Sequence, residues 1–140
     1  MDRIAPGLFV GSAESAADAS RQQTVGISTV CALTHDPPTG GYPDAVSVVH
    51  VPMMDGPRND PEAFRQAVDA VVAARDADET VLVHCSRGGS RSPAVAAAAL
   101  AVRRGCPVEA ALAEVRASRP EADPHPVLVD RAEAAVHALG

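Results

Sequence analysis

Residues 83–93, Val-His-Cys-Ser-Arg-Gly-Gly-Ser-Arg-Ser-Pro, carry the clearest information about the fold. It follows the short apolar run Thr80 to Val83, which is typical of a buried strand. It precedes an Ala-rich segment, about Ser92 to Arg104, in which Ala favours a helix. Between the two, Gly88 and Gly89 interrupt any regular structure. The stretch therefore predicts a strand, a glycine-containing loop and a helix in direct succession.

The predicted loop has the properties of an anion-binding loop. Where a loop joins a strand end to a helix start, successive backbone N–H groups can point inward and hold a tetrahedral anion at the positive end of the helix dipole. The guanidinium of Arg91 can hold two phosphoryl oxygens at once, which a Lys ammonium could not do. We therefore expect phosphate to be bound by Ser86, Arg87, Gly88, Gly89, Ser90 and Arg91.

Cys85 is the candidate nucleophile. The inward N–H groups, the helix end and Arg91 all favour the thiolate over the thiol, and the thiolate is the form that attacks phosphorus. Ser92 can donate its hydroxyl to the Cys85 sulfur when that sulfur becomes a leaving group. These residue types at this spacing predict nucleophilic catalysis, with Arg91 stabilising charge on the phosphoryl oxygens in the transition state.

The loop offers no acid to protonate a departing oxygen, so a carboxylic acid has to come from another segment. Asp55 is the best candidate, because it follows an apolar run and lies in a loop rich in Gly and Pro. A turn role is the other interpretation, since Asp-Gly pairs are common in turns. Asp60 is the competing acid, but its place before Pro61 is better explained as a helix cap.

The rest of the chain alternates between strand and helix patterns. The β-branched run over 46–51 suits a buried strand. This alternation predicts an α/β fold with a mostly parallel sheet, and 140 residues without a linker predict one domain over residues 1–140. The elements expected outside the loop region are a short hairpin or an extended segment around Pro6-Gly7, a helix over 13–23, strands over 28–33 and 46–51, and helices over 61–77, 107–118 and 127–139.

Composition excludes several classes of partner. The net charge is -6, all 12 basic residues are Arg, and aromatic residues make up only 2%, which argues against nucleic acid or an anionic membrane as partner. Three cysteines without a Cys-x-x-Cys pair indicate neither a zinc site nor a disulfide framework. The free thiols suit a reducing compartment. We therefore expect a cytoplasmic protein without a metal.

The remaining cysteines and histidines have weaker assignments. Cys31 could form a disulfide with an oxidised Cys85, but core packing is the favoured interpretation. Cys106 is expected to be incidental. The side chain of Arg87 either attracts acidic residues of a substrate or is simply solvated. Histidines without ligand spacing are expected to be surface or structural residues, namely His35, His50, His125 and His137.

The loop resembles the signature of the dual-specificity branch of the cysteine-dependent protein tyrosine phosphatases. That signature is His-Cys-x-x-Gly-x-Ser-Arg-Ser, often followed by Pro, and it is complete over His84 to Pro93. Further segments look like the opening residues, a strand, the acid loop and a late helix of the same family. These segments, in the order of the family, are 4–11, 26–30, 51–55 and 109–120.

The resemblance implies a central, mainly parallel sheet of four or five strands flanked by helices. It implies hydrolysis in two steps through a phosphocysteine, without a cofactor. Residue by residue, it makes Cys85 the nucleophile, Arg91 the phosphate ligand, Asp55 the general acid and then base, and Ser92 the group that assists thiolate departure. His84 is expected to support the loop through hydrogen bonds.

The leading hypothesis is a protein phosphatase for phosphotyrosine, with phosphoserine and phosphothreonine as further candidates. A second enzymatic hypothesis keeps the chemistry but changes the substrate to an RNA 5′-phosphate or a phosphoinositide, against which the lack of a basic surface argues. A non-catalytic phosphate-binding module is a third, although degenerate relatives usually lack the Cys or the Arg. A sulfur-transfer or arsenate-reducing enzyme is a fourth, in which Asp55 has no clear place.

Overall fold

The computed structural model describes all 140 residues, and its centre is one sheet of five strands in the order β1-β2-β5-β3-β4. Strands β1 and β2 pair antiparallel, whereas the β2-β5, β5-β3 and β3-β4 pairs are parallel. This arrangement confirms the predicted α/β class and the mostly parallel sheet. The strands are β1 Asp2–Ala5, β2 Leu8–Gly11, β3 Thr29–Ala32, β4 Ser47–His50 and β5 Val81–His84.

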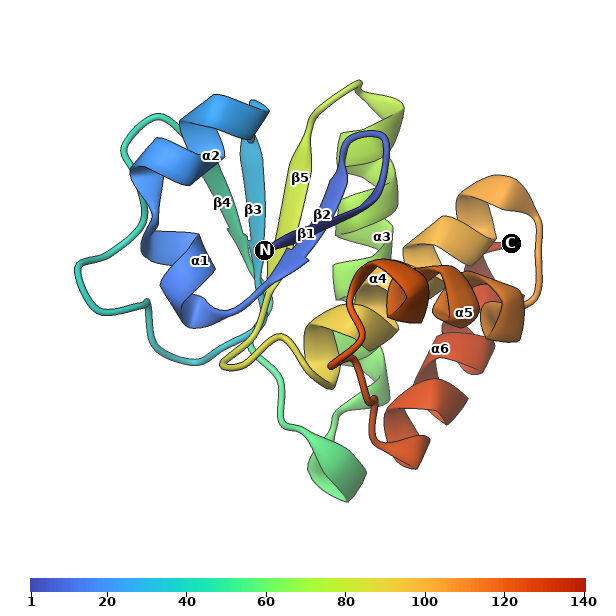
Figure 1. Ribbon diagram of the computed structural model, residues 1–140. Coiled ribbons are helices and arrows are strands. Elements are labelled where there is room, and N and C mark those ends of the chain that lie inside the picture. The colour runs from blue at the N-terminus through green and yellow to red at the C-terminus, as the bar shows by residue number, and fades with distance from the viewer.

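Helices cover both faces of the sheet, with α1 and α2 on one side and the other helices on the opposite side (Figure 1). No helix combines the length and the apolar character needed to cross a membrane. The helices are α1 Ala13–Ala17, α2 Ala19–Val25, α3 Pro61–Asp76, α4 Arg91–Arg104, α5 Val108–Ser118 and α6 Pro126–Leu139, with a 3-10 turn, η1, over Gly56–Arg58.

The predicted single helix over 13–23 is wrong, because the structure has two helices there. Asp18 ends α1 and begins α2, and its carboxylate accepts a hydrogen bond of 3.0 Å from the Arg21 N–H. The buried side chain of Gln22 then donates to the carbonyls of Ser15 and Ala16, at 2.8 and 2.9 Å. A capping carboxylate and a buried amide thus stabilise a bend in a segment that is otherwise rich in helix-forming Ala.

Strand β4 is exposed, which corrects the prediction of a buried strand. It lies at the edge of the sheet, and Val48 and Val49 are 40% and 36% exposed although they point to opposite faces. A β-branched run indicates a strand, but it does not say whether that strand lies at the centre or at the edge. The edge position leaves both faces of β4 only partly covered by helices.

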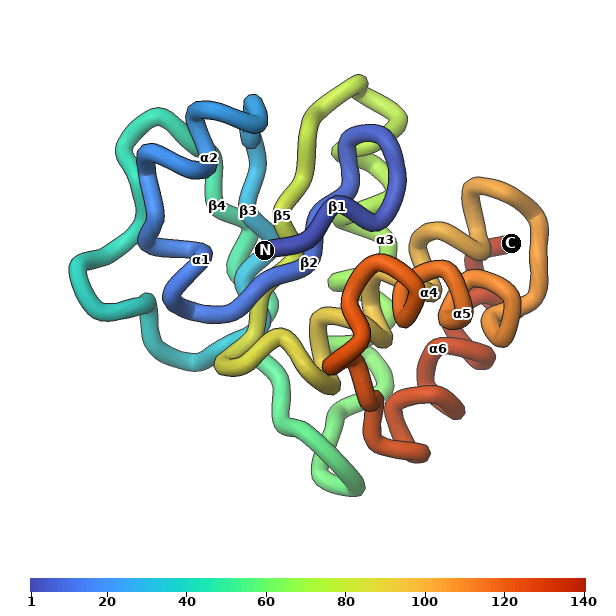
Figure 2. Tube along the Cα trace, viewed as in Figure 1, coloured from blue at the N-terminus to red at the C-terminus, as the bar shows by residue number.

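Helix α4 forms the centre of the helical layer. Every residue from Ser92 to Ala101 is buried, and the helix contacts α3, α5, α6 and the strands β2 and β5. Small Ala side chains let these neighbours approach closely. The trace in Figure 2 runs from β5 through one bent loop into α4. Packing on all sides therefore holds the first turn of α4, and the loop before it, in a fixed position.

Candidate active site

The loop between β5 and α4 needs glycine at one position for two reasons. Gly88 is buried and has φ +70°, a conformation that other residues rarely adopt. A Cβ at this position would lie 2.7 Å from the backbone oxygen of Gly11 and 2.6 Å from the Arg119 guanidinium. Gly89 has neither constraint, because its Cβ would meet nothing closer than 3.9 Å. The glycine that the loop requires is therefore Gly88.

The loop presents a row of unpaired hydrogen-bond donors. None of the backbone N–H groups from Ser86 to Ser90 donates to an acceptor within the protein. These five residues directly precede the first turn of α4, where the helix dipole is positive. Unpaired N–H groups at a helix N-terminus form a site for a tetrahedral anion.

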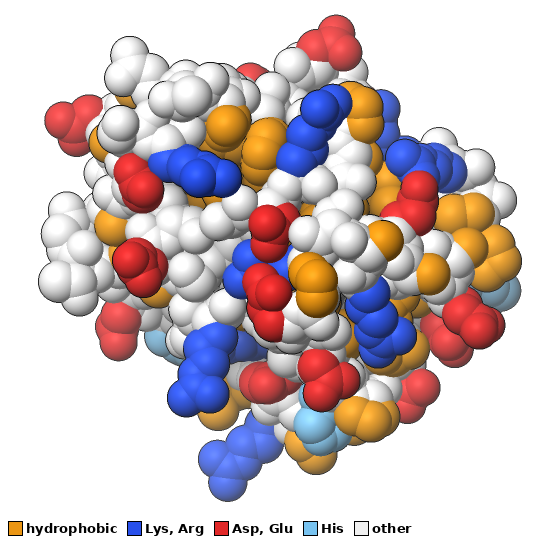
Figure 3. All heavy atoms as spheres, viewed as in Figure 1, with side chains coloured by type: hydrophobic (Ala, Val, Ile, Leu, Met, Phe, Trp, Pro, Cys, Tyr) orange, Lys and Arg blue, Asp and Glu red, His pale blue; other side chains and the backbone are white.

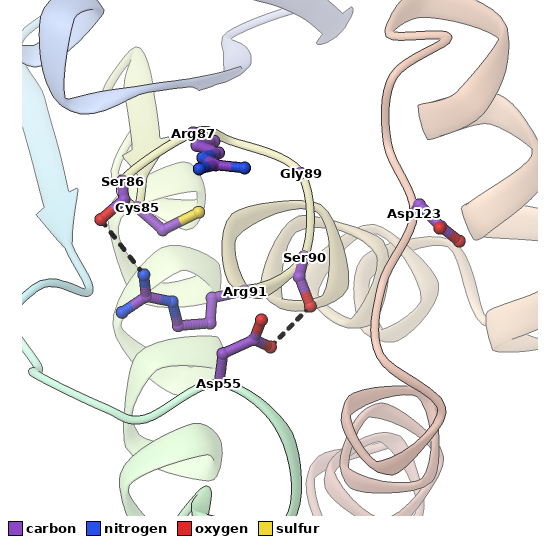
Figure 4. Close-up of a pocket in the computed structure, with 8 residues that line it drawn as sticks. All are labelled: Asp55, Cys85, Ser86, Arg87, Gly89, Ser90, Arg91 and Asp123. Carbon is purple, nitrogen blue, oxygen red and sulfur yellow. Dashed lines mark hydrogen bonds between the residues drawn. The ribbon is translucent and has the colours of Figure 1, made fainter.

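The thiol of Cys85 lies inside this loop. Cys85 is 2% exposed, and in Figure 4 its sulfur points into the space that the loop surrounds. Its Sγ lies 3.2 Å from the Ser92 Oγ, and the Ser92 N–H donates to the sulfur at 3.5 Å. Ser92 is fully buried, so its hydroxyl has no contact with solvent. Its hydrogen-bond partners are the sulfur and the carbonyl of Gly11, which lies 3.5 Å away.

Arg91 begins α4 and turns its guanidinium back toward the pocket. Its Nη1 donates to the carbonyl of Met53 at 3.1 Å, and its Nη2 donates to the Ser86 hydroxyl at 3.4 Å (Figure 4). Met53 belongs to the segment that follows β4. Arg91 therefore joins the anion-binding loop to the segment that carries Asp55.

Asp55 lies at the rim of the same pocket. Its carboxylate caps η1 by accepting from the Gly56 N–H at 2.9 Å, and it accepts from the Ser90 hydroxyl at 2.7 Å (Figure 4). The Ser90 oxygen in turn accepts from the His125 N–H at 2.9 Å. Because a backbone N–H can only donate, the single hydrogen of the Ser90 hydroxyl goes to Asp55. This chain of bonds places the carboxyl group beside the loop.

The pocket has a volume of about 360 Å³, and all but one of its lining residues are candidates predicted from the sequence. Gly88, Ser92 and His84 are predicted residues that lie behind the lining. Asp60 does not line the pocket either, since its carboxylate accepts from the Glu62 N–H at the start of α3. The lining residues are Asp55, Cys85, Ser86, Arg87, Gly89, Ser90, Arg91 and Asp123.

The surroundings of the pocket carry charges of both signs. The side chain of Arg87 is exposed at the rim, as is that of Asp123. On the face drawn in Figure 3, Arg side chains are interspersed with Asp and Glu.

His84 supports the loop from below and is fully buried. Its Nδ1 lies 3.2 Å from the carbonyl of Cys85, and its Nε2 lies 2.9 Å from the hydroxyl of Tyr42. A carbonyl can only accept, so Nδ1 carries the proton and Nε2 accepts from Tyr42. Burial, with smaller contributions from Arg91 and His50, lowers the pKa of His84, although its bond to the Cys85 carbonyl opposes this shift. The imidazole is therefore held neutral.

Several residues around the site were not assigned a role from the sequence. Tyr42 contacts His84, the backbone of His125 orients Ser90, and Arg119 contacts the back of the loop. Each lies in a segment distant from the loop in sequence. Arg119 falls in the segment 109–120, which looks like a late helix of the family, but that pattern did not indicate a contact with the loop. Cys31 is buried within the core, where burial raises the pKa of its thiol to about 12. At neutral pH this thiol stays protonated, as the core-packing interpretation requires.

The sequence matches a known protein family over most of its length. Residues 8–130 match the family described as "Dual specificity phosphatase, catalytic domain". Human dual specificity phosphatase 28 is 35% identical over 125 residues, which cover 89% of this chain and 70% of the human protein. The mouse protein of the same name is 33% identical over 124 residues, which cover 88% of this chain and 76% of the mouse protein.

The structure is similar to solved structures of the same family. The crystal structure of human dual specificity phosphatase 28 superposes with a TM-score of 0.89 at 31% identity, covering 99% of this chain and 97% of the human one. A second crystal structure, of a mouse putative dual specificity phosphatase complexed with zinc tungstate, gives a TM-score of 0.88 at 29% identity. The superposition covers 99% of this chain and 87% of the mouse one. The chain therefore belongs to the dual-specificity phosphatase family and is a cysteine-dependent protein phosphatase.

Proposed function

We propose that this chain hydrolyses phosphotyrosine, and also phosphoserine and phosphothreonine, on protein substrates through a phosphocysteine intermediate. The observation that carries the proposal is the position of the Cys85 sulfur inside a loop whose five backbone N–H groups from Ser86 to Ser90 have no acceptor in the protein, with Arg91 at the end of the same loop. Such a site binds the three non-bridging oxygens of a phosphoryl group while a sulfur nucleophile faces the phosphorus.

In the first step, the Cys85 thiolate attacks phosphorus and the bond from phosphorus to the ester oxygen breaks. The loop N–H groups and the Arg91 guanidinium stabilise the negative charge on the phosphoryl oxygens. Asp55 gives its proton to the departing oxygen, which leaves as the free hydroxyl of the side chain. The products of this step are a phosphocysteine and the Asp55 carboxylate.

In the second step, the Asp55 carboxylate takes a proton from water as the water oxygen attacks phosphorus. The bond from phosphorus to sulfur breaks, and inorganic phosphate and the Cys85 thiolate are formed. Ser92, whose Oγ lies 3.2 Å from the sulfur, stabilises the departing thiolate by donating its hydroxyl hydrogen. The site is then ready for another substrate.

A cytoplasmic location is part of the proposal. All three cysteines are free in the structure, and the mechanism requires Cys85 as a thiolate rather than as a disulfide. A reducing compartment keeps thiols in that state.

The proposal is tested by phosphate release from an aryl phosphate and from phosphopeptides, in buffer containing a chelator. The wild type should release phosphate, and Cys85→Ser should not, because a neutral hydroxyl is a poor nucleophile. Arg91→Lys should lower kcat by about 100-fold or more, since Lys cannot form the bidentate contact. Cys106→Ser, a substitution outside the pocket, serves as the matched control and should behave as wild type.

The same assay distinguishes the substrate classes. An RNA 5′-phosphate and a phosphoinositide are assayed beside the phosphopeptides at equal concentration, and the phosphopeptides should be hydrolysed fastest. An inert wild type, or a Cys85→Ser variant that keeps its activity, would contradict the mechanism. Faster release from the RNA or the lipid would contradict the proposed substrate class alone.

A further inference from the structure

Arg119 is a buried arginine that contacts the anion-binding loop from the side opposite the pocket. It follows α5, and its side chain is only 8% exposed. Its Nε donates to the carbonyl of Gly88 at 2.7 Å, and its Nη2 donates to the carbonyl of Arg87 at 3.1 Å. Arg119 does not line the pocket. It therefore forms hydrogen bonds with the outer face of the loop, the face that points away from the pocket.

These two bonds determine which way the neighbouring N–H groups point. A trans peptide unit is planar, and its C=O and N–H point in opposite directions. The chain has no cis peptide bond. The peptide units whose carbonyls face Arg119 carry the N–H groups of Gly88 and Gly89, which consequently point away from Arg119. Neither N–H has an acceptor in the protein.

We propose that Arg119 is a positioning residue, which orients the Gly88 and Gly89 N–H groups toward the phosphoryl group by bonding the carbonyls on the outer face of the loop. This inference rests on the proposed function, because it assigns the two N–H groups to the phosphoryl oxygens. Gly88 is required for the same arrangement. A side chain at this position would collide with the Arg119 guanidinium, so only glycine lets Arg119 bond the carbonyls of Arg87 and Gly88.

The contribution of Arg119 is geometric rather than electrostatic. Its Nη1 lies 2.8 Å from the carboxylate of Asp2 and 3.2 Å from that of Glu121. Two carboxylates thus offset the single positive charge, and little of its field reaches the pocket. Asp2 belongs to β1, the edge strand that pairs with β2, so the first strand of the sheet holds the guanidinium in place.

The test measures the affinity of the protein for tungstate, a tetrahedral oxyanion, by titration calorimetry. Arg119→Met should bind tungstate about tenfold more weakly, because two charge-assisted hydrogen bonds to the loop are lost. Arg119→Lys should not restore the affinity, since an ammonium donates from a single nitrogen and cannot replace the separate Nε, Nη1 and Nη2 donors of the guanidinium. The matched control is Arg116→Met, which removes an exposed arginine from the last turn of α5, just before Arg119, and should leave the affinity unchanged.

A second readout separates orientation of the loop from general stability. Iodoacetate is an anion and iodoacetamide is neutral, so the ratio of their rates of Cys85 alkylation reports how well the loop attracts an anion. Arg119→Met should lower this ratio severalfold at a temperature where the variant is fully folded, and Arg116→Met should not. A loss of stability alone would change both alkylation rates together.

Asp2→Ala keeps Arg119 and removes one of its anchors, so it provides a test even if both Arg119 variants fail to fold. It should weaken tungstate binding about threefold. The inference would be overturned if Asp2→Ala and every folded Arg119 variant bound tungstate as tightly as the wild type. It would also be overturned if Arg119→Lys bound tungstate as tightly as the wild type, because charge rather than geometry would then explain the role of Arg119. Binding of tungstate that depends on Arg119, in a protein that releases no phosphate, would support this inference and contradict the proposed function.

Discussion

At the scale of single residues, the chemistry depends on side chains whose roles differ although their types are the same. Asp55 and Asp60 are both capping carboxylates in adjacent turns, and each accepts a backbone N–H. Only Asp55 also accepts from a residue of the anion-binding loop, through Ser90. Position relative to the loop, rather than capping, therefore distinguishes the proposed acid from its neighbour.

Replacement of the proposed acid should affect catalysis in a way that depends on the leaving group. Asp55→Asn should lower kcat by about 100-fold or more with an alkyl phosphate, because an alkoxide needs a proton to depart. The loss should be smaller with an aryl ester of low leaving-group pKa. Rates measured with an alkyl phosphate and over a series of phenyl phosphates check this expectation.

The matched control for this prediction is Asp60→Ala. It should cost about 0.5–2 kcal/mol of stability through the lost helix cap, with kcat unchanged. If Asp60→Ala lost activity and Asp55→Asn kept it, the assignment of the acid would be reversed.

At the scale of elements, the loop between β5 and α4 depends on one backbone conformation. Gly88→Ala should destabilise the protein by about 1–3 kcal/mol, because it forces a side chain into a left-handed conformation and against the Gly11 carbonyl. Gly89→Ala, at the next position, has room for its Cβ and should change stability by less than about 0.5 kcal/mol. Urea unfolding of the two variants measures this difference, and equal losses would show that the loop does not have the described conformation.

The elements also show how far a local pattern can be trusted. Helices α3, α4, α5 and α6 begin and end within a few residues of their predicted limits, because each has a Pro, Gly or Asp at a boundary. The helix predicted over 13–23 is interrupted at Asp18, where the gain from the cap and from the buried Gln22 outweighs the helix propensity of Ala. Such a bend depends on tertiary contacts, which helix propensities do not take into account.

At the scale of the whole molecule, stability should depend on pH through the buried His84. Burial lowers its pKa in the folded protein below the ordinary value of 6.5. As the pH falls through 6.5, the unfolded chain therefore binds a proton that the folded chain does not, and stability decreases until the pH reaches the lowered pKa. Burial also raises the pKa of Tyr42, so its hydroxyl stays a donor to His84 throughout this range.

His84→Gln should accordingly show a weaker loss of stability on acidification below pH 6.5, although its stability at pH 7 is lower. His137→Gln, which replaces an exposed histidine, should follow the wild type. The measurement is the midpoint of urea unfolding between pH 7.5 and 5. Parallel curves for wild type and His84→Gln would contradict a neutral, buried imidazole.

The class of fold and the centre of the candidate site could be predicted from the sequence alone. Cys85 and Arg91 lie in one short loop, whose conformation depends on its own glycine and on the strand and helix that it joins, so neighbouring residues are enough to predict it. Asp55 could be proposed because it follows a strand pattern, and parallel strands end at the same edge of a sheet.

The distant residues that support that centre were found only in the folded structure. Arg119 and Asp2 are bonded to each other although 117 positions separate them, and Tyr42 reaches His84 across 42 positions. Whether β4 is buried was decided in the same way, by the order of the strands. The physical reason is that local preferences act between neighbours along the chain, whereas these contacts arise only when the sheet and the helices pack together.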